Sequence, residues 1–520
     1  MREQLQAFGD FLVSNRAKLV EQMLEHLGLT FLSLLLAVLI AVPLGIFIAR
    51  KDRYAGGILA FTGILQTIPS IALLGFMIPI LGIGIKPAIF ALFLYALLPI
   101  LRNTYTGIRE VEPSVVEAAR GIGMSNGQIL RQVELPLAMP VLFAGIRTAT
   151  VINVGVATLA AYIGAGGLGE FIFGGIALNN TMMILAGSIP AALLAIFFDQ
   201  LLAGLQRMPR FQRRHLALGL LILLPLLSGF YWASNAVSPG LKAGFDPEFS
   251  GRADGYGKLV EVYDLKFNTL VLNAGLMYRA VKEGLVDVIG GYSTDGRIKA
   301  FDLVVLEDDR HVFPPYQCAP LLNGNTVEKH PELVPLLNRL AGKISDATMT
   351  ALNYEVDHNK RSPAAVATEF LKSVDLWQPD RSQGGATVTI GSKIFTEQYI
   401  LVEIYAQLIN GYTDLDVDAK VGLGGTKICF DALRAGEIDL YPEYTGTGFQ
   451  VILSPPDSLI QTINADADAV YDYVQTEFAA QYHLQWLSPL GFNNTYALMV
   501  RSEQAKKEGW TKISDLNWSY

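Results

Sequence analysis

The chain has 520 residues, of which 51% are hydrophobic and only 17% are charged. Soluble domains carry about a quarter charged residues, so this composition excludes a wholly soluble, disordered or fibrous protein. The charges are also unevenly divided, because residues 1–235 hold 16 Lys and Arg against 11 Asp and Glu, whereas residues 236–520 hold 24 against 37. We therefore predict a basic, apolar membrane domain at 1–235 and an acidic domain in water at 236–520, with no nucleic-acid partner.

The membrane domain is indicated by six apolar runs, most of them near the roughly 20 residues that a helix needs to cross a bilayer. They cover 28–49, 57–83, 87–101, 139–163, 181–205 and 216–235. We predict an all-α transmembrane domain of about six helices. Arg and Lys concentrate in the loops after the first, third and fifth runs, and short loops rich in these residues stay in the cytoplasm. The protein is then a multi-pass protein of the cytoplasmic membrane, with its N-terminus and residues 236–520 on the extracytoplasmic side.

The predicted cytoplasmic loop 102–138 carries a distinctive pattern around Glu117, Ala118, Ala119, Arg120 and Gly121. An Ile follows at 129 and a Leu-Pro pair at 135–136. By itself, the pattern is that of an amphipathic connector on the membrane surface. It also resembles the coupling loop of ABC importer permeases, which implies a MetI-like permease whose loop rests on a separate ATPase. Glu117 and Arg120 would then be contact residues, and Gly121 would supply the turn between two short helices.

No motif for covalent chemistry is found in the chain. A phosphate-binding loop needs glycines followed by Gly-Lys-Ser/Thr, and the stretch 424–427 reads Gly-Gly-Thr-Lys, in the wrong order. Neither a Ser-His-Asp or Cys-His set nor a metal-ligand cluster is present. We therefore predict that the chain is not an enzyme and binds no metal or cofactor. ATP and Mg would be used by the partner ATPase, two copies of which would act on a homodimer of this chain.

Only two cysteines occur, Cys318 and Cys429. They are either paired in an exported domain or two small, unpaired core residues.

Beyond residue 236, strand-like and helix-like patterns alternate, which is typical of an α/β fold with parallel strands. We expect short strands at Leu259–Tyr263, Asp287–Ile289 and Leu303–Leu306, and helices at 276–284 and 330–353. About 285 residues suit either one two-lobed domain or two small domains.

Several motifs of this region resemble the extracytoplasmic binding proteins of choline, glycine betaine and carnitine importers. The motifs cover 245–249, 292–297, 313–316, 391–398, 424–426, 439–447 and 493–497. The resemblance spans nearly the whole of 236–520 and implies a two-lobed, type II periplasmic-binding-protein-like domain. Together with the permease pattern, it implies a permease fused to its own binding domain.

The order of these motifs differs from that of the family, because the late motifs precede the early ones. We interpret this as a circular permutation, with the old ends joined by the polar, glycine-containing linker 378–386. Lobe A would then cover 297–489, lobe B would cover 236–296 and 490–520, and Tyr520 would lie near 236–241. A fusion of two incomplete binding domains and a truncated tandem are the alternatives.

The resemblance also implies a cage of tyrosines, because quaternary ammonium groups donate no hydrogen bonds and are recognised by aromatic faces. By motif position, the cage candidates are Tyr444, Tyr496, Tyr316 and Tyr292, with Tyr441 in reserve. The candidate donors to a ligand carboxylate are Thr447, Thr396, Lys393 and Asn494. Lys393 is either a cation in the pocket, which would favour a zwitterion over choline, or a surface lysine. Arg252, Asp254 and Asp295 are expected to bridge the lobes or fix loops.

The two resemblances together imply an ABC importer subunit that takes up a quaternary ammonium compatible solute such as glycine betaine, for osmoprotection. Ergothioneine, carnitine and choline are alternative ligands. A membrane-anchored ligand sensor is the alternative from another class, although a sensor would not need the loop pattern at 117–136.

Overall fold

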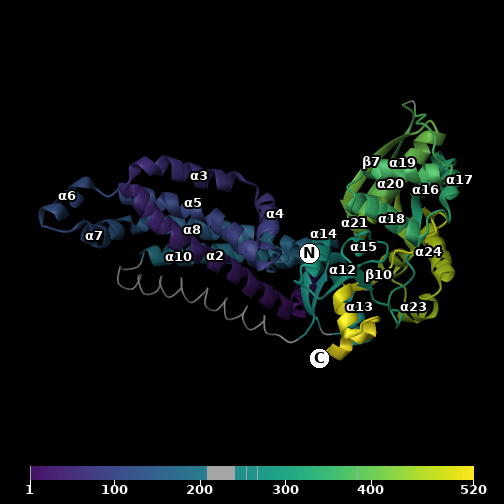
Figure 1. Cartoon of the computed structure of the whole chain (residues 1–520), viewed down its shortest axis with the longest axis horizontal. Coiled ribbons are helices and arrows are strands. Elements are labelled where there is room, and N and C mark those ends of the chain that lie inside the picture. The colour runs from purple at the N-terminus through teal and green to yellow at the C-terminus, as the bar shows by residue number, and fades with distance from the viewer. Residues whose placement is uncertain (1, 208–239, 253, 266, 383, 520) are drawn as a thin grey trace. The chain divides into compact units, whose positions relative to one another are not determined.

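The structure is a computed structural model that describes residues 2–207, 240–252, 254–265, 267–382 and 384–519. The described residues form two compact units, a helical one before residue 239 and an α/β one after it. Figure 1 shows their elements in chain order.

In the helical unit, four helical segments among the described residues are long and apolar enough to cross a membrane. They include the helices α2 (Arg16–Arg50), α5 (Ile85–Arg109), α8 (Leu135–Ala160) and α10 (Thr181–Arg207). These helices confirm four of the six predicted spans. The predicted span at 216–235 lies outside the described residues.

The predicted span at 57–83 is a bent pair of helices, α3 (Ala55–Thr67) and α4 (Ser70–Leu81), which meet at 98°. The break has a local cause, because Pro69 follows Ile68 and a residue before proline is driven out of the α region. Ile68 accordingly has an extended ψ of 126°. One spanning helix was expected here, and the proline bends it sharply.

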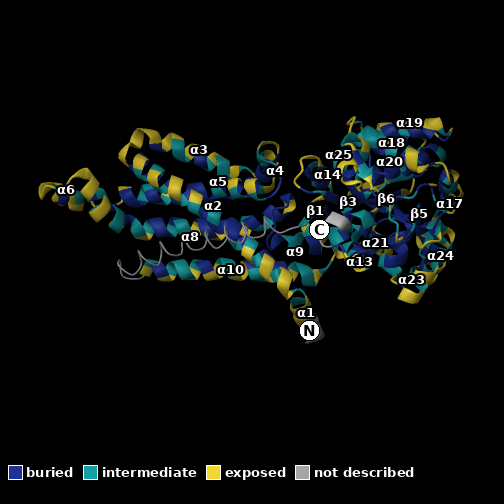
Figure 2. Cartoon of the chain, turned by 60° about the horizontal axis from the view of Figure 1, so that its bottom comes forward, coloured by how far each residue is buried: buried dark blue, intermediate teal, exposed yellow. Residues whose placement is uncertain are grey.

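The long helices pack through close contacts, α2 on α5, α5 on α8 and α8 on α10. A Cβ added to Gly145 of α8 would lie 2.7 Å from the carbonyl oxygen of Pro99 in α5, so only glycine fits there. Arg147 of α8 donates two hydrogen bonds of 3.0 and 2.9 Å to Asp199 of α10, which pairs both charges within the bundle. Large apolar side chains such as Phe61 and Ile64 of α3 remain exposed, and Figure 2 shows this exposed face.

The remaining helices of this unit are short. They are α1 (Arg2–Ser14), α6 (Pro113–Gly121), α7 (Asn126–Ile129) and α9 (Gly169–Ala177). Irregular helical turns lie at Asp52–Tyr54, Leu130–Glu134 and Ala161–Ile163 among the described residues of this unit.

The α/β unit contains two five-stranded sheets. The sheet of lobe B has the order β2-β1-β3-β10-β4, and that of lobe A the order β7-β6-β8-β5-β9. The lobe B strands are β1 (Lys242–Phe245), β2 (Asn268–Val271), β3 (Val288–Tyr292), β4 (Leu303–Val305) and β10 (Tyr496–Arg501). The lobe A strands are β5 (Cys318–Asn323), β6 (Thr387–Lys393), β7 (Asp416–Gly424), β8 (Leu440–Tyr444) and β9 (Leu484–Trp486).

Both sheets are mixed, whereas parallel strands were expected. β1 and β3 pair in parallel, as β6 does with β7 and β8. The antiparallel strands are β5, which pairs with β8 and β9, and β10, which pairs with β3 and β4. The chain crosses from lobe B to lobe A at 306–317 and returns to lobe B at 487–495. β5 and β10 are the first strands after these crossings. Each enters its sheet at the edge where the neighbouring strands end, and it therefore runs antiparallel to them.

The predicted start of lobe A at 297 is wrong for residues 303–305. Val304 and Val305 pair with Val500 and Met499 of β10, so β4 belongs to the sheet of lobe B. The chain therefore changes lobe only after β4. The described residues of the linker 378–386 form no helix or strand. Tyr520 and residues 236–239, for which proximity was predicted, lie outside the described residues.

The helices of this unit cover the sheets. They are α12 (Pro247–Gly251), α13 (Tyr256–Tyr263), α14 (Ala274–Lys282), α15 (Arg297–Ala300), α16 (Gly324–Lys329), α17 (Leu333–Leu337), α18 (Asp346–Asp357), α19 (Pro363–Ser373), α20 (Thr396–Tyr412), α21 (Thr426–Ala435), α22 (Thr445–Thr447), α23 (Asp457–Ile463), α24 (Ala467–Tyr482) and α25 (Ser502–Glu508). Irregular helical turns lie at Asn338–Leu340, Gly448–Leu453 and Ile513–Ser519.

Two local predictions fail in this unit. The expected strand Leu259–Tyr263 is part of helix α13, because Leu259 and Tyr263 are four residues apart and both are fully buried on one helix face. The expected helix 330–353 is divided into α17 and α18 by a turn at Gly342, whose φ of +65° favours glycine. The predicted helix 276–284 is confirmed as α14, and the strands at 287–289 and 303–306 as β3 and β4.

Both cysteines are buried and free, which excludes the disulfide and confirms the alternative that they are core residues.

Candidate functional site

The candidate site lies between the two lobes, where several strand ends meet. β3, β6 and β8 all end at this edge, and the carboxyl ends of strands in an α/β sheet are where ligands bind. A cavity opens there. Its lining residues are Glu248, Arg252, Tyr292, Tyr316, Lys393, Phe395, Tyr444, Thr447, Asn494 and Tyr496.

The cavity brings together seven of the nine residues predicted to bind a ligand. The two exceptions are Tyr441 and Thr396. Tyr441 is fully buried in the core of lobe A, where its hydroxyl donates to Glu443 at 2.8 Å. The hydroxyl of Thr396 donates to Asp357 at 2.6 Å, and Thr396 lines a neighbouring cavity. Tyr441 therefore lies in the hydrophobic core, and Thr396 lines the neighbouring cavity, which shares Tyr292 with the first.

Five aromatic rings form a continuous wall along this cavity. The ring centroids of Tyr316 and Tyr496 are 5.7 Å apart, and those of Tyr496 and Tyr292 are 5.1 Å apart. Phe395 stacks on Tyr292 at 5.4 Å and on Tyr444 at 6.2 Å, which joins the two lobes. Burial raises the pKa of all four tyrosines well above the usual value, so the phenols are neutral. The wall presents uncharged π-systems to a ligand.

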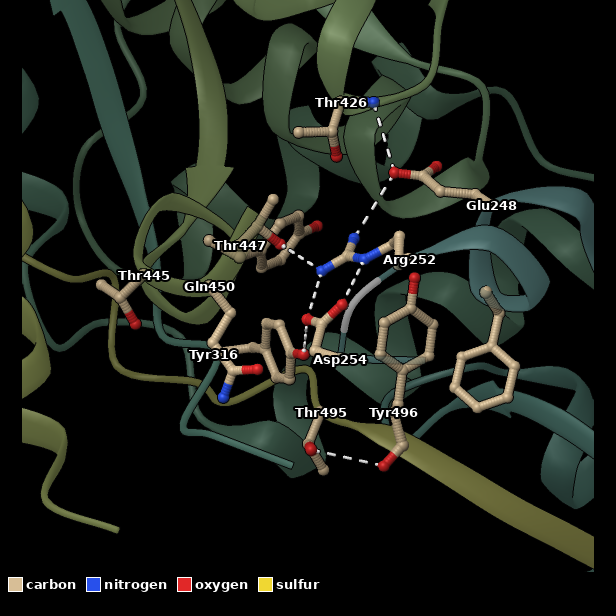
Figure 3. A network of polar contacts seen from close by, with 12 residues as sticks. Glu248, Arg252, Asp254, Tyr316, Thr426, Thr445, Thr447, Gln450, Thr495 and Tyr496 are labelled. Carbon is tan, nitrogen blue, oxygen red and sulfur yellow. Dashed lines mark hydrogen bonds and ion pairs between the residues drawn. The ribbon is translucent and has the colours of Figure 1, made fainter. Parts of the chain in front are cut away.

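Arg252 provides the first cation at the cavity. Its guanidinium lies 5.0 Å from the centre of the Tyr496 ring and 6.0 Å from that of Tyr316. It donates to Asp254 at 2.8 and 2.7 Å and, from lobe B to lobe A, to Thr447 at 3.3 Å, as Figure 3 shows. The hydroxyl of Tyr316 also donates to Asp254. Although burial opposes ionisation, the guanidinium holds the pKa of Asp254 below its usual value.

Lys393 provides the second cation. It is 4% exposed, which excludes the interpretation as a surface lysine. Its ammonium donates to the buried carboxylate of Glu443 at 2.6 Å and lies 5.1 Å from the centre of the Tyr444 ring. Both cations at the cavity therefore pair with a buried carboxylate that is not among the lining residues.

Three lining residues were not among the predicted ligand contacts. Arg252 was expected to bridge the lobes, which its bond to Thr447 does, but it also lines the cavity. Glu248 accepts a hydrogen bond from the backbone of Thr426 in lobe A at 3.4 Å. Phe395 lies within the motif 391–398, and its position two residues after Lys393 was the available signal.

The second candidate surface is the segment 110–134 of the helical unit, where α6 and α7 lie together at one end of the bundle (Figure 1). The segment is shorter than the predicted loop 102–138, because α5 continues to Arg109. Glu117, Ala118 and Arg120 are exposed on α6, whereas Ala119 is buried. Ile122 directly after the helix is 81% exposed.

The predicted turn at Gly121 is wrong. Gly121 is the last residue of α6, and the left-handed residue between α6 and α7 is Gly123, with a φ of +87°. Gly123 is therefore the position that needs glycine. Ser125 caps the N-terminus of α7. Its hydroxyl accepts a hydrogen bond from the backbone N–H of Gln128, and the side chain of Gln128 accepts one from the backbone N–H of Ser125.

Comparison with known proteins covers both units. Residues 41–210 match the family model described as "Binding-protein-dependent transport system inner membrane component". Residues 233–373 and 386–519 match the model described as "Substrate binding domain of ABC-type glycine betaine transport system". The chain belongs to the ABC-type glycine betaine transport family.

Relatives of the family's permeases match the first part of the chain. The choline transport system permease protein OpuBB of Bacillus subtilis (strain 168) is 49% identical over 197 residues, which are 38% of this chain and 91% of the relative. The glycine betaine/carnitine/choline transport system permease protein OpuCB of the same organism is 47% identical over the same shares. A solved structure of the MetNI methionine ABC transporter is 27% identical, covers 36% of this chain and 96% of its own, and has a TM-score of 0.33.

Membership in this family confirms the predicted fold class, a helical permease followed by a binding domain with two lobes. As a member of the transporter family, the protein is an integral membrane protein and a transport subunit. The two family models match one chain, so the permease and the substrate-binding domain are fused in it.

Proposed function

We propose that this chain imports a quaternary ammonium compatible solute, such as glycine betaine, as the fused permease and binding subunit of an ABC importer. The observation that carries the proposal is the wall of five rings from both lobes, with Arg252 and Lys393 at the same cavity. A trimethylammonium group would face the rings, since it is bound by their negative potential. A ligand carboxylate would face the ammonium of Lys393 and the hydroxyl of Thr447.

The ligand preference tests this assignment. Isothermal titration calorimetry of the detergent-purified full chain is expected to show tighter binding of glycine betaine than of choline, because only betaine offers Lys393 a carboxylate. Lys393→Gln should weaken glycine betaine binding about tenfold, roughly the value of one charge-assisted hydrogen bond, and change choline binding by less than about threefold.

Carnitine and ergothioneine are included in the titration as other trimethylated zwitterions. A chain that binds none of these four ligands would refute the proposed function. Tighter binding of choline, unchanged by Lys393→Gln, would keep the import function and exclude the role of Lys393 as the carboxylate partner.

The transport cycle that we propose needs partners. The exposed face of α6, with Glu117, Ala118, Arg120 and Ile122, would rest on an ATPase subunit in the cytoplasm. Two copies of that ATPase would serve a homodimer of this chain and hydrolyse ATP with Mg. Residues 240–519 would then lie on the extracytoplasmic side, which agrees with the basic loops on the other side.

We also propose that the binding domain is circularly permuted. In support, the family model matches on both sides of residues 374–385 and leaves these residues unmatched. Strands from both sides build each sheet, since β5 pairs with β8 and β9, and β10 pairs with β3 and β4. This interleaving is expected of one permuted domain and not of two incomplete ones.

Cleavage of the linker tests the permutation. We expect the full chain, with a protease site introduced at 380–385, to remain one particle after cleavage in gel filtration, because sheet pairs cross the cut in both lobes. The cut chain should bind glycine betaine within about threefold of the uncut chain. Fragments that separate without denaturant would contradict one permuted domain.

A further inference from the structure

A second cavity adjoins the aromatic wall, and Glu397 is one of its lining residues. It shares Tyr292, Phe395 and Asn494 with the first cavity. Glu397 is 2% exposed, and no lysine or arginine of the described part of the chain forms an ion pair with it. A buried carboxylate without a cation must be held by hydrogen bonds, since its desolvation is otherwise costly.

Four side chains donate those hydrogen bonds, and they come from both lobes and from a crossover segment between them. From lobe A, the Tyr444 hydroxyl donates at 2.6 Å and the Asn353 amide at 3.1 Å. From lobe B, the Thr294 hydroxyl donates at 2.6 Å, and from the crossover segment the Asn494 amide donates at 2.8 Å. The complete set therefore exists only when the two lobes are together.

The backbones of the two lobes touch at the same place. The Asn353 amide also donates to the carbonyl oxygen of Thr294, at 2.9 Å. Two residues further along, a Cβ added to Gly296 would lie 2.4 Å from the backbone nitrogen of Tyr354. Glycine at 296 thus permits an approach of the lobes that any side chain would block.

We infer that Glu397 is a positioning residue that couples closure of the lobes to the ligand site. It orients Tyr444 and Asn494 only when Thr294 and Asn353 donate their hydrogen bonds to it. This inference rests on the proposed function, because Tyr444 is taken as a wall of the ligand site. In the open form the carboxylate loses its lobe B donor and is hydrated. Closure then replaces water by Thr294 and fixes the Tyr444 ring against the ligand.

The test measures closure and binding in the same full-length chain. Spin labels at Glu503→Cys in lobe B and Asp418→Cys in lobe A report the distance between the lobes by pulsed electron paramagnetic resonance; the native cysteines are buried. In the parent chain, glycine betaine should shift the distances to the short population. Glu397→Ala should weaken binding at least about tenfold and leave most molecules open at a betaine concentration that closes the parent.

Two further variants separate positioning from folding. Glu397→Gln keeps an acceptor oxygen and should recover part of the affinity and of the closed population. Gly296→Ala leaves every aromatic residue intact and should hold the lobes open, with a similar loss of affinity. Glu403→Gln on the same helix α20 is the matched control and should behave as the parent.

The outcomes distinguish this inference from the proposed function. If the parent chain does not close with glycine betaine, carnitine or choline, the proposed function fails and the inference fails with it. If the parent closes but Glu397→Gln and Thr294→Val close as fully, with parental affinity, the inference alone is overturned. Thr294→Val removes one donor from the opposite lobe and serves where Glu397→Ala does not fold.

Discussion

Tyr444→Ala is expected to abolish measurable binding of glycine betaine to the full chain, an affinity loss of at least about a hundredfold. The ring ends the aromatic wall on the side of lobe A, where it stacks on Phe395 and lies beneath the Lys393 ammonium. Its removal takes away a face for the trimethylammonium group and opens the cavity to water. Calorimetry of the purified chain measures the loss.

The matched control for this prediction is Tyr473→Ala. Tyr473 is a partly buried tyrosine of the same lobe that packs edge-on against Phe449 and lines neither cavity. Its truncation should lower the melting temperature and leave the affinity within about twofold. Parental affinity in Tyr444→Ala, or an equal loss in both variants, would contradict the assigned ligand site.

Ile122→Asp is expected to reduce uptake of glycine betaine more than about tenfold while binding by the same chain is unchanged. Ile122 follows α6 directly and exposes 81% of its surface, against 41% for Val115 of the helix, so it is the most exposed large apolar side chain there. Apolar side chains at the centre of an interface carry much of its free energy, and a buried carboxylate without a partner would weaken it. Uptake into proteoliposomes with the partner ATPase, and co-purification of that ATPase, measure the effect.

Ile122→Val keeps the apolar surface and should transport at nearly the parental rate. If Ile122→Asp transports normally with the ATPase still bound, this face of α6 is not the ATPase contact. A loss of both uptake and binding would point to misfolding of the chain, which the melting temperature detects.

The sequence predicted the two units and most of the candidate site, because the motifs lie where strands end. Lys393 ends β6, Tyr292 ends β3 and Tyr444 ends β8, and a fold that aligns strand ends brings such residues together. Tyr441 could not be separated from Tyr444 by motif alone. The two are three positions apart on β8 and face opposite sides of the strand, so one enters the core and the other the cavity.

Other features needed the packing of distant segments. Arg252 and Thr447 are far apart in sequence and meet only across the cleft, so no spacing could place Arg252 at the cavity. Glu397 was part of a recognised motif, yet its four donors come from four separate segments. The strand predicted at Leu259–Tyr263 failed because a five-residue apolar pattern does not separate a period of 2 from one of 3.6.

The sequence by itself determined that this protein has a membrane unit and an α/β unit, because apolar runs and charge asymmetry are local and additive properties. It also determined the family, through motifs that remain legible when their order is changed. Only the tertiary structure decided that strands on both sides of residues 374–385 share two sheets, and that a carboxylate receives donors from both lobes. These are consequences of contacts between residues distant in the chain. Such contacts form only when the chain folds, and no local pattern in the sequence reports them.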